Sequence, residues 1–282
     1  MAQSYSNGRD ILRFEQSIHL APEHALNSFF AAVPAVAIPA CFLYATCHYL
    51  ITPTVMIWLW RAHPEQYRRV RSVLVVGTLV ALLGFWLLPT APPRLIGGFS
   101  DTMAHWSSVG WWGTAASVPD GLEGLTDQAG AMPSLHVGWA LWCGWAVARC
   151  AKRRWVRALG IAYPVITILV VIGTANHYLA DAVAGAAVIG LGMLVVAVIV
   201  RVQARHIAGR LIRSVGVSHR TAPALAAEEI RDLAAETSQS GPENVDSAEN
   251  ADLTEERSCL MARTSPATQR DDRKNGPHRT DR

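Results

Sequence analysis

Residues 155–200 have the sequence WVRALGIAYPVITILVVIGTANHYLADAVAGAAVIGLGMLVVAVIV, in which two long apolar stretches flank one short polar fragment. A helix needs about 20 consecutive, mostly apolar residues to cross a bilayer. The stretches at about 155–175 and 178–200 both meet this requirement. The polar fragment NHYLAD (176–181) lies at the boundary between them. The pattern predicts two membrane-spanning helices, joined at a point that carries a histidine and an aspartate.

Similar apolar stretches occur earlier in the chain. Two of them, at about 71–89 and 134–150, are long enough to be spans. The uncharged region 29–60 is too long for one span and short for two. We interpret it as a span at about 41–60, preceded by a helix at about 22–38 that is either a first span or a re-entrant segment. We therefore predict an all-α, polytopic membrane helical bundle with about six transmembrane helices, and with five as the alternative.

The positions of Lys and Arg predict the orientation of these helices, because short cytoplasmic loops are rich in both residues. Residues 61–71 hold four arginines, residues 149–157 hold five basic residues, and residues 201–213 hold four arginines. By contrast, residues 91–132 hold a single basic side chain, Arg94. We expect the first three regions to be cytoplasmic and 91–132 to be extracytoplasmic. With six spans, the N-terminus then lies inside the cell.

The C-terminal part of the chain differs in composition from the rest. Residues 202–282 contain thirteen acidic residues and twelve Lys or Arg, whereas residues 1–201 contain nine acidic residues. A segment of such low hydrophobicity cannot offset the entropy cost of ordering. We predict a cytoplasmic N-terminal segment (1–21), a transmembrane catalytic domain (22–201), and a cytoplasmic, largely disordered tail (202–282). A short helix at about 222–236 is possible within the tail.

The remaining composition excludes several classes of protein. The sequence pI of about 8.7 is explained by the basic cytoplasmic loops, so we expect no nucleic-acid partner. The five cysteines form no CxxC pair and show no metal-ligand spacing, so the sequence supports neither a disulfide framework nor a zinc site.

Three polar fragments lie at borders between apolar stretches and loops, and the predicted topology puts all of them at one membrane face. They are APPR (91–94), MPSLH (132–136) and NHYLAD (176–181). Ionisable groups are costly in lipid, so their presence at a span indicates function. We therefore expect an extracytoplasmic site in a multi-pass protein of the cell membrane.

The third fragment supports nucleophilic or acid–base chemistry. His177 and Asp181 are four residues apart and share one face of a helix. A carboxylate in that position accepts a hydrogen bond from one imidazole nitrogen and leaves the other nitrogen free as a nucleophile or base. We expect Asn176 to cap the helix, whose N-terminal amides attract anions.

The other two fragments suit a phosphate-bearing substrate. Pro133 and Ser134 form a predicted helix start, with His136 in its first turn. Arg94 supplies a permanent positive charge with a planar fork that matches phosphate. Together the fragments predict a site for an anionic, phosphate-bearing substrate.

The order of these residues resembles the type 2 phosphatidic acid phosphatase (PAP2) superfamily, and more closely its inositol-phosphorylceramide-synthase-like branch. The resemblance covers about residues 40–200. The block Pro133-Ser134-Leu135-His136 matches the P-S-x-H motif of the family. His177 and Asp181 match the H-x-x-x-D end of its third motif, and Arg94 after Pro92-Pro93 corresponds to the first motif.

The resemblance implies a lipid phosphatase or phosphotransferase with a phosphohistidine intermediate. In such enzymes the histidine matched by His177 attacks phosphorus, and the aspartate matched by Asp181 orients it. The histidine matched by His136 protonates the leaving oxygen. Arg94 would bind phosphate, and we expect Pro133, Ser134 and Asn176 to contribute to substrate binding.

The sequence departs from the common family motifs at two cations. The lysine of the first motif is replaced by Leu87 and the proline after its arginine by Leu95, while Val170 and Val171 stand in place of the Ser-Arg pair of the third. The synthase-like branch also lacks that third-motif arginine.

A phosphate monoester is nearly a dianion, and its transfer is stabilised mainly by electrostatics. With Arg94 as the only fixed cation, we expect a phosphodiester or lipid-linked donor rather than a simple monoester.

The final acceptor is left open between water and an alcohol such as inositol, and we expect no metal and no other cofactor. One alternative is a transporter in which His and Asp form a proton relay. The ionisable groups crowd one face, whereas a relay needs them through the depth of several helices. A metal-dependent hydrolase with His136, His177 and Asp181 as ligands, and a purely structural scaffold, are further alternatives.

A few residues outside the motifs also bear on function. His48 lies within an apolar stretch and either packs there or touches the site, while His105 belongs to a loop. The outer loop carries three tryptophans, which either anchor the protein at the headgroup level or form part of a lid over the substrate. They are Trp106, Trp111 and Trp112.

Overall fold

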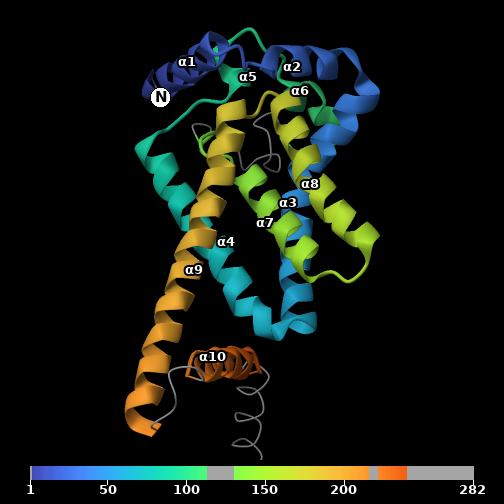
Figure 1. The fold of residues 1–282 in the computed structure, drawn as a ribbon. Coiled ribbons are helices and arrows are strands. Elements are labelled where there is room, and N and C mark those ends of the chain that lie inside the picture. Colours follow the sequence, from blue (N-terminus) through green and yellow to red (C-terminus); the bar gives the residue numbers. More distant parts are fainter. Residues whose placement is uncertain (1, 113–129, 216–221, 240–282) are drawn as a thin grey trace, which may run out of the picture. The chain divides into compact units, whose positions relative to one another are not determined.

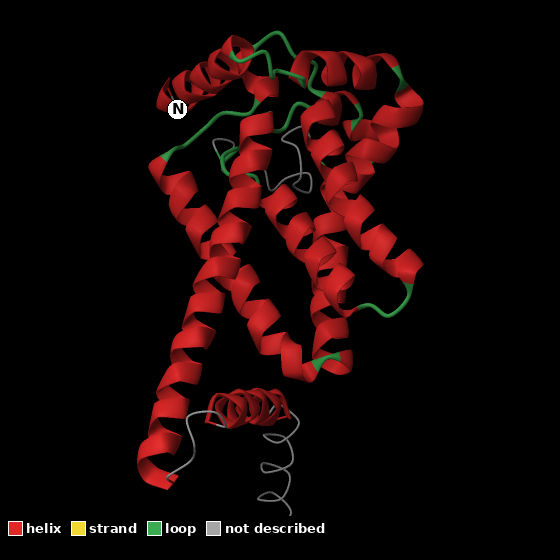
Figure 2. Ribbon diagram, in the orientation of Figure 1, coloured by secondary structure: helices red, strands yellow, loops and turns green. Residues whose placement is uncertain are grey.

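The structure, a computed structural model, describes residues 2–112, 130–215 and 222–239. Within these ranges every regular element is a helix, and Thr90 and Gly130 pair in an isolated bridge. Figure 2 shows this all-helical architecture. The predicted fold class is confirmed.

Five long helices run between the two ends of the bundle (Figure 1). They are α3 (Pro34–Ala62), α4 (Pro64–Leu87), α7 (Leu135–Cys150), α8 (Arg154–Gly173) and α9 (Leu179–Val215). All except α7 are long and apolar enough to cross a membrane. The 16-residue α7 packs against each of the other four, so it is the central helix of the bundle.

The helix expected at about 22–38, as a first span or a re-entrant segment, is shorter in the structure. The chain forms a separate helix there, α2 (Glu23–Ala32), whose ten residues extend only about 15 Å, half the thickness of the hydrocarbon core. Val33 is extended, with φ −124° and ψ 91°, and α3 begins at Pro34. This break separates α2 from α3, so the two do not form one continuous helix.

The first helix, α1 (Ala2–Ser17), lies at the same end of the bundle as the three polar fragments (Figure 1). The amide of Ala91 donates to the carbonyl of Ser4 at 3.0 Å, and the Asn7 side chain donates to the carbonyl of Pro89 at 2.8 Å. The N-terminal segment was expected on the face opposite the polar fragments. In the structure α1 packs at the same end of the bundle as these fragments.

Three short helices follow α4 at this end of the bundle. They are α5 (Pro93–Ile96), α6 (Thr102–His105) and the 3-10 helix η1 (Ser107–Val109). The helix α9 continues to Val215, beyond the predicted start of the tail at residue 202. The expected short helix of the tail is present as α10 (Ala222–Gln239), and the rest of the tail lies outside the described residues.

The bundle has two clusters of buried apolar residues. One lies toward the polar end and includes Phe30, Tyr44 and Val171. The other includes Leu59 and Trp142. Small residues allow the central helix to approach its neighbours: a Cβ on Gly144 of α7 would lie 2.5 Å from the carbonyl oxygen of Gly160 of α8. The close α7–α8 packing therefore depends on glycine at this position.

Candidate active site

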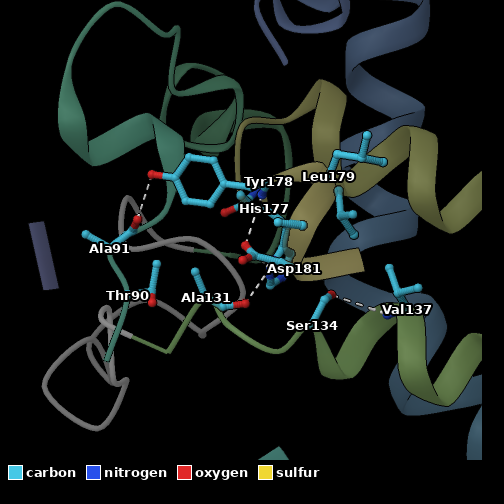
Figure 3. A network of polar contacts seen from close by, with 12 residues as sticks. Thr90, Ala91, Ala131, Ser134, Val137, His177, Tyr178, Leu179 and Asp181 are labelled. Carbon is cyan, nitrogen blue, oxygen red and sulfur yellow. Dashed lines mark hydrogen bonds and ion pairs between the residues drawn. The ribbon is translucent and has the colours of Figure 1, made fainter. Parts of the chain in front are cut away.

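The three polar fragments meet through backbone hydrogen bonds, as the topology predicted. The amide of Arg94 in the first fragment donates to the carbonyl of Ala175, next to the third fragment, at 3.0 Å. The amide of Ser134 in the second fragment donates to the carbonyl of Asp181 in the third, also at 3.0 Å. Segments far apart in the sequence are thus brought to one place (Figure 3).

His177 lies between two hydrogen-bond acceptors, and both are near the same ring nitrogen. Its Nδ1 is 2.9 Å from the carbonyl oxygen of Ala131 and 3.3 Å from Oδ2 of Asp181 (Figure 3). Because both neighbours only accept, Nδ1 must carry the proton, and Nε2 then keeps its lone pair. The predicted contact between His177 and Asp181 is present, and both side chains are buried.

A tight turn after α8 presents this histidine. Ala175 has a positive φ of 56°, in the left-handed region that reverses a chain at the end of a helix. The amides of Asn176 and His177 both donate to the carbonyl of Val171, each at 3.1 Å. The backbone of the nucleophile candidate is therefore fixed to the last turn of α8.

Asn176 does not cap α9, in contrast to the prediction. Its side-chain amide donates to the hydroxyl of Thr174 at 2.9 Å, and its carbonyl oxygen accepts from Nε of Arg94 at 2.9 Å. The side chain therefore links the turn before His177 to α5 instead of pointing at the start of the following helix.

Carboxylates occupy the first amides of α9. Oδ2 of Asp181 accepts from the amide of Tyr178 at 2.9 Å. The amide of Leu179 donates to Glu23 and the amide of Ala180 donates to Glu15. The expectation that these amides attract a substrate anion is therefore wrong, because side chains of the protein itself already use them.

The second fragment starts α7 as predicted. The hydroxyl of Ser134 accepts from the amide of Val137 at 3.4 Å and caps the helix. Close packing fixes this start against α9, since a Cβ on Gly185 would lie 2.4 Å from the carbonyl oxygen of Ser134. The first turn of α7, which carries His136, is thereby held against the helix that carries Asp181.

His136 lies next to His177 within a group of aromatic rings. The centroids of the two imidazole rings are 5.7 Å apart. Tyr44 stacks on His136 at 4.4 Å, and His48 contacts it edge-on at the same centroid distance. Within the described part of the chain, Nε2 of His136 is buried and has no hydrogen-bond partner. That nitrogen is therefore available to a reacting group.

Arg94 is held by two partners beside the histidine loop. Its Nη1 is 3.3 Å from Oδ2 of Asp101, and its side chain is 7% exposed. Asp101 also accepts from the amide of Ala104 and so caps α6. The positive charge that the first fragment contributes is partly neutralised by this ion pair.

The third-motif positions, where the family usually carries Ser-Arg, are apolar in the structure as well as in the sequence. Val170 and Val171 are buried in the core cluster near the polar end. A cavity beside them borders His136 and His48 and is otherwise lined mostly by apolar and aromatic side chains of α3 and α8, among them Leu43, Tyr44 and Ile166. This cavity suits an apolar group next to the two imidazoles.

Tyr178 ties the third fragment to the first. Its hydroxyl donates to the carbonyl of Ala91 at 2.9 Å (Figure 3). Burial, followed by the nearby charges of Asp181, Glu15 and Glu23, raises the pKa of this hydroxyl well above its ordinary value. The tyrosine is therefore a neutral hydrogen-bond donor at every physiological pH.

The outer tryptophans have different surroundings. Trp112 is buried and donates to the carbonyl of Met103 at 3.0 Å, so it is a core residue and not an interfacial anchor. Trp111 is exposed and donates to the hydroxyl of Thr46. The expected lid falls largely on residues 113–129, which lie outside the described residues.

Sequence reasoning missed Glu15 and Glu23, and it left His48 undecided. A histidine within an apolar stretch is a signal for function, and His48 does contact His136. The two glutamates belong to a polar segment in which no motif marks them. Their contacts with α9 come from residues more than 150 positions away in the chain.

This geometry agrees with a comparison to known families. The chain matches the model of the PAP2 superfamily over residues 9–195, more than half of its length, and therefore belongs to that superfamily. Membership supports a phosphatase-type function, the hydrolysis of phosphoric esters, with lipid phosphates in a membrane as substrates. No curated protein and no solved structure matches the chain.

Proposed function

We propose that this protein is an integral membrane enzyme that transfers a phosphoryl group or a phospho-headgroup from a lipid through a phosphohistidine at His177. The observation that carries the proposal is the environment of that ring. Nδ1 is engaged by Ala131 and Asp181, so Nε2 keeps a lone pair, and the ring of His136 lies beside it. A nucleophile oriented by a buried carboxylate and flanked by a second titratable group is the arrangement that covalent phosphoryl transfer requires.

The reaction proceeds in two balanced steps. Nε2 of His177 attacks phosphorus, a P–N bond forms, and the P–O bond to the leaving group breaks as its oxygen takes the proton held by His136. Water or an alcohol then transfers its proton to His136 while its oxygen attacks phosphorus. The P–N bond breaks and His177 is restored. Asp181 stabilises the positive ring by accepting from Nδ1 throughout.

The electrostatics of Arg94 favour a donor with one negative charge. Its ion pair with Asp101 leaves the site with less positive charge than a free guanidinium would supply. A phosphodiester needs less compensation than a phosphate monoester. Phosphodiesters or lipid-linked donors are therefore the preferred substrates.

The acceptor is water in a phosphatase, or an alcohol such as inositol in a transferase of the inositol-phosphorylceramide-synthase-like branch. The same residues serve both reactions. The basic loops support a site at the extracytoplasmic face of the cell membrane, with the C-terminal tail in the cytoplasm. Pro133, Ser134 and Asn176 position the fragments that surround the substrate.

The test is product release from a panel of radiolabelled lipid phosphates and phosphodiesters in detergent, with excess EDTA and with or without inositol. Wild type is compared with His177→Ala, and with His105→Ala as a control, because the His105 side chain is exposed and its ring contacts Trp106. Inorganic phosphate released by wild type and by the control alone establishes the phosphatase. A new lipid or sugar phosphate that needs the alcohol establishes the transferase.

Three results would contradict the proposal. Equal activity of His177→Ala and wild type would show that His177 is not the nucleophile. Loss of activity in EDTA that returns with a divalent cation supports a metal-dependent reaction. Rapid cleavage of phosphatidic acid without cleavage of any diester overturns the diester preference.

A further inference from the structure

Two glutamates of the N-terminal helices reach the first turn of α9, the helix that follows His177. Oε1 of Glu15 in α1 accepts from the amide of Ala180 at 2.6 Å, and Oε1 of Glu23 in α2 accepts from the amide of Leu179 at 2.8 Å. Both side chains are buried. A helix usually receives its caps from the residues just before it, whereas here they come from two other helices.

The geometry points to Glu15 and Glu23 as positioning residues, a carboxyl clamp through which α1 and α2 fix the first turn of α9 and thereby the orientation of His177. This inference rests on the proposed role of His177. The structural part, docking of the clamp on two named amides, can be tested without any activity.

The clamp is linked to the histidine through Asp181. The same first turn supplies Oδ2 of Asp181, which accepts from Nδ1 of His177 and from the amide of Tyr178. Without acceptors for Leu179 and Ala180, the turn frays, because unsatisfied N-terminal amides are what destabilise a helix end. Asp181 then loses its fixed distance to the imidazole ring.

The clamp also has to hold a proton. Glu15, Glu23 and Asp181 gather at one helix terminus, whose dipole compensates only about half a charge. Each of the three carboxyl groups has one buried oxygen without a hydrogen-bond partner among the described residues. Three buried negative charges at one terminus are prohibitive, so at least one carboxyl group is protonated in the docked state.

We place this proton on Glu15, whose carboxyl group also interacts with that of Glu23. Burial raises its pKa from 4.5 to about 8, and the charges of Glu23 and Asp181 add to this, against the opposing hydrogen bond from Ala180. Tyr178 also faces the group and stays neutral. The helix α5 packs against α1 as well, and its Arg94 is bound to Asp101 and Asn176. The clamp is therefore docked when Glu15 is protonated and weakens as pH rises past about 8.

The first measurement is hydrogen–deuterium exchange at single amides of the full-length protein in detergent. Glu15→Ala should raise exchange about ten-fold at Ala180, and Glu23→Ala should raise it about ten-fold at Leu179, since each removes one acceptor. Asp10→Asn, which removes an exposed carboxylate of α1 that pairs with Arg13, should change neither amide. Unchanged protection in both glutamate variants overturns the clamp.

The second measurement is the pH profile of kcat, with phosphatidic acid and a phospholipid diester as substrates. Wild type should lose kcat above about pH 8, while Glu15→Gln keeps an acceptor and a donor without a charge and should not show this decline. Glu15→Ala should lower kcat about ten-fold with little change in KM. An identical alkaline decline in wild type and Glu15→Gln overturns the proton-bearing role.

The two measurements separate the two proposals. If amide protection changes as expected but no variant, including wild type, turns over either lipid, the clamp stands and the proposed function fails. If the alanine variants do not fold, the pH dependence of exchange at Ala180 in Glu15→Gln and in wild type tests the clamp instead. Protection that falls with pH in wild type and not in this variant supports the clamp, and the same fall in both contradicts it.

Discussion

The polar end of the bundle and its opposite end are stabilised in different ways. At the polar end, hydrogen bonds between distant segments hold the turn that carries His177, and three carboxyl groups meet at the start of α9. At the opposite end, apolar side chains fill the space between helices. Trp142 is fully buried there, with its single polar atom satisfied by the carbonyl of Val70 at 2.8 Å.

The two ends therefore depend on different properties: the polar end on the geometry of its hydrogen bonds, and the opposite end on the filled volume of its core. A polar contact between distant segments fixes the direction and distance of one atom, so its loss changes the reactive arrangement more than the total packing. An apolar core depends on filled volume, so its disruption lowers stability while a distant site keeps its geometry. Substitutions at the two ends should therefore separate activity from stability.

The largest effect is expected from His177→Ala at the polar end. Removal of the nucleophile should lower kcat by roughly a thousand-fold or more. The thermal midpoint should change less than for a core substitution at the opposite end. Activity assays and thermal unfolding in the same detergent measure both quantities, and His105→Ala serves as the control. Retention of even a tenth of wild-type kcat contradicts the prediction.

The reciprocal change is Trp142→Ala at the opposite end. It leaves a large cavity and removes the hydrogen bond to Val70, so it should lower the free energy of unfolding by about 3 kcal/mol. The kcat of the folded fraction should stay within about two-fold of wild type, since no reacting group is near. Trp155→Ala is the matched control, because that ring is exposed. A kcat loss larger than the stability loss would show that the two ends are coupled.

Gly185→Ala tests the contact where packing and site meet. The added Cβ would lie 2.4 Å from the carbonyl oxygen of Ser134, so the start of α7 must move away from α9. We expect about 1–3 kcal/mol of destabilisation together with a loss of kcat, because His136 lies in that first turn. Gly190→Ala on the same helix, where the added Cβ has open space, should leave kcat unchanged and should not lower stability. A normal kcat in Gly185→Ala would mean that the site tolerates this displacement.

Tyr178→Phe removes one hydrogen bond between the first and third fragments. Loss of the contact with Ala91 should cost about 1 kcal/mol of stability and leave the carbonyl without this donor. Tyr49→Phe, at an exposed ring of α3, is the control for the chemical change. Equal thermal midpoints for the two variants would show that the polar end does not depend on this bond.

The smallest expected effect is a dependence of stability on pH. Since the pKa of Glu15 is raised from 4.5 to about 8, the folded state keeps this proton when the unfolded state has lost it. Its contribution is therefore fully present below pH 4.5 and is lost as pH rises to about 8. Relative to Glu15→Gln, the thermal midpoint of wild type should fall as pH rises from 5 to 9. A constant difference between the two proteins contradicts the shift.

The sequence predicted the parts of the molecule that local patterns encode. Apolar stretches located the long helices, and the Ser134 cap and the contact between His177 and Asp181 follow from spacing along one helix. The predicted topology then placed the three polar fragments at one membrane face. These features depend on neighbouring residues, so one sequence was enough to predict them.

Features that depend on distant contacts or on one backbone angle were not predicted. Val33 carries no marker for its extended conformation beyond the proline that follows, and this residue divides the expected helix at 22–38 into the end of α2 and the start of α3. Asn176 was predicted to cap α9. The first amides of this helix instead donate to Glu15 and Glu23, which lie more than 150 residues earlier in the chain. A side chain that completes a site from so far away leaves no spacing pattern.

The position of α1 and α2 also determines which solution the clamp senses. Because both helices lie at the same end of the bundle as His177, Glu15 exchanges its proton with the compartment at that end. A change of acidity in that compartment reaches Glu15 directly, whereas a change on the opposite side would first have to cross the bilayer.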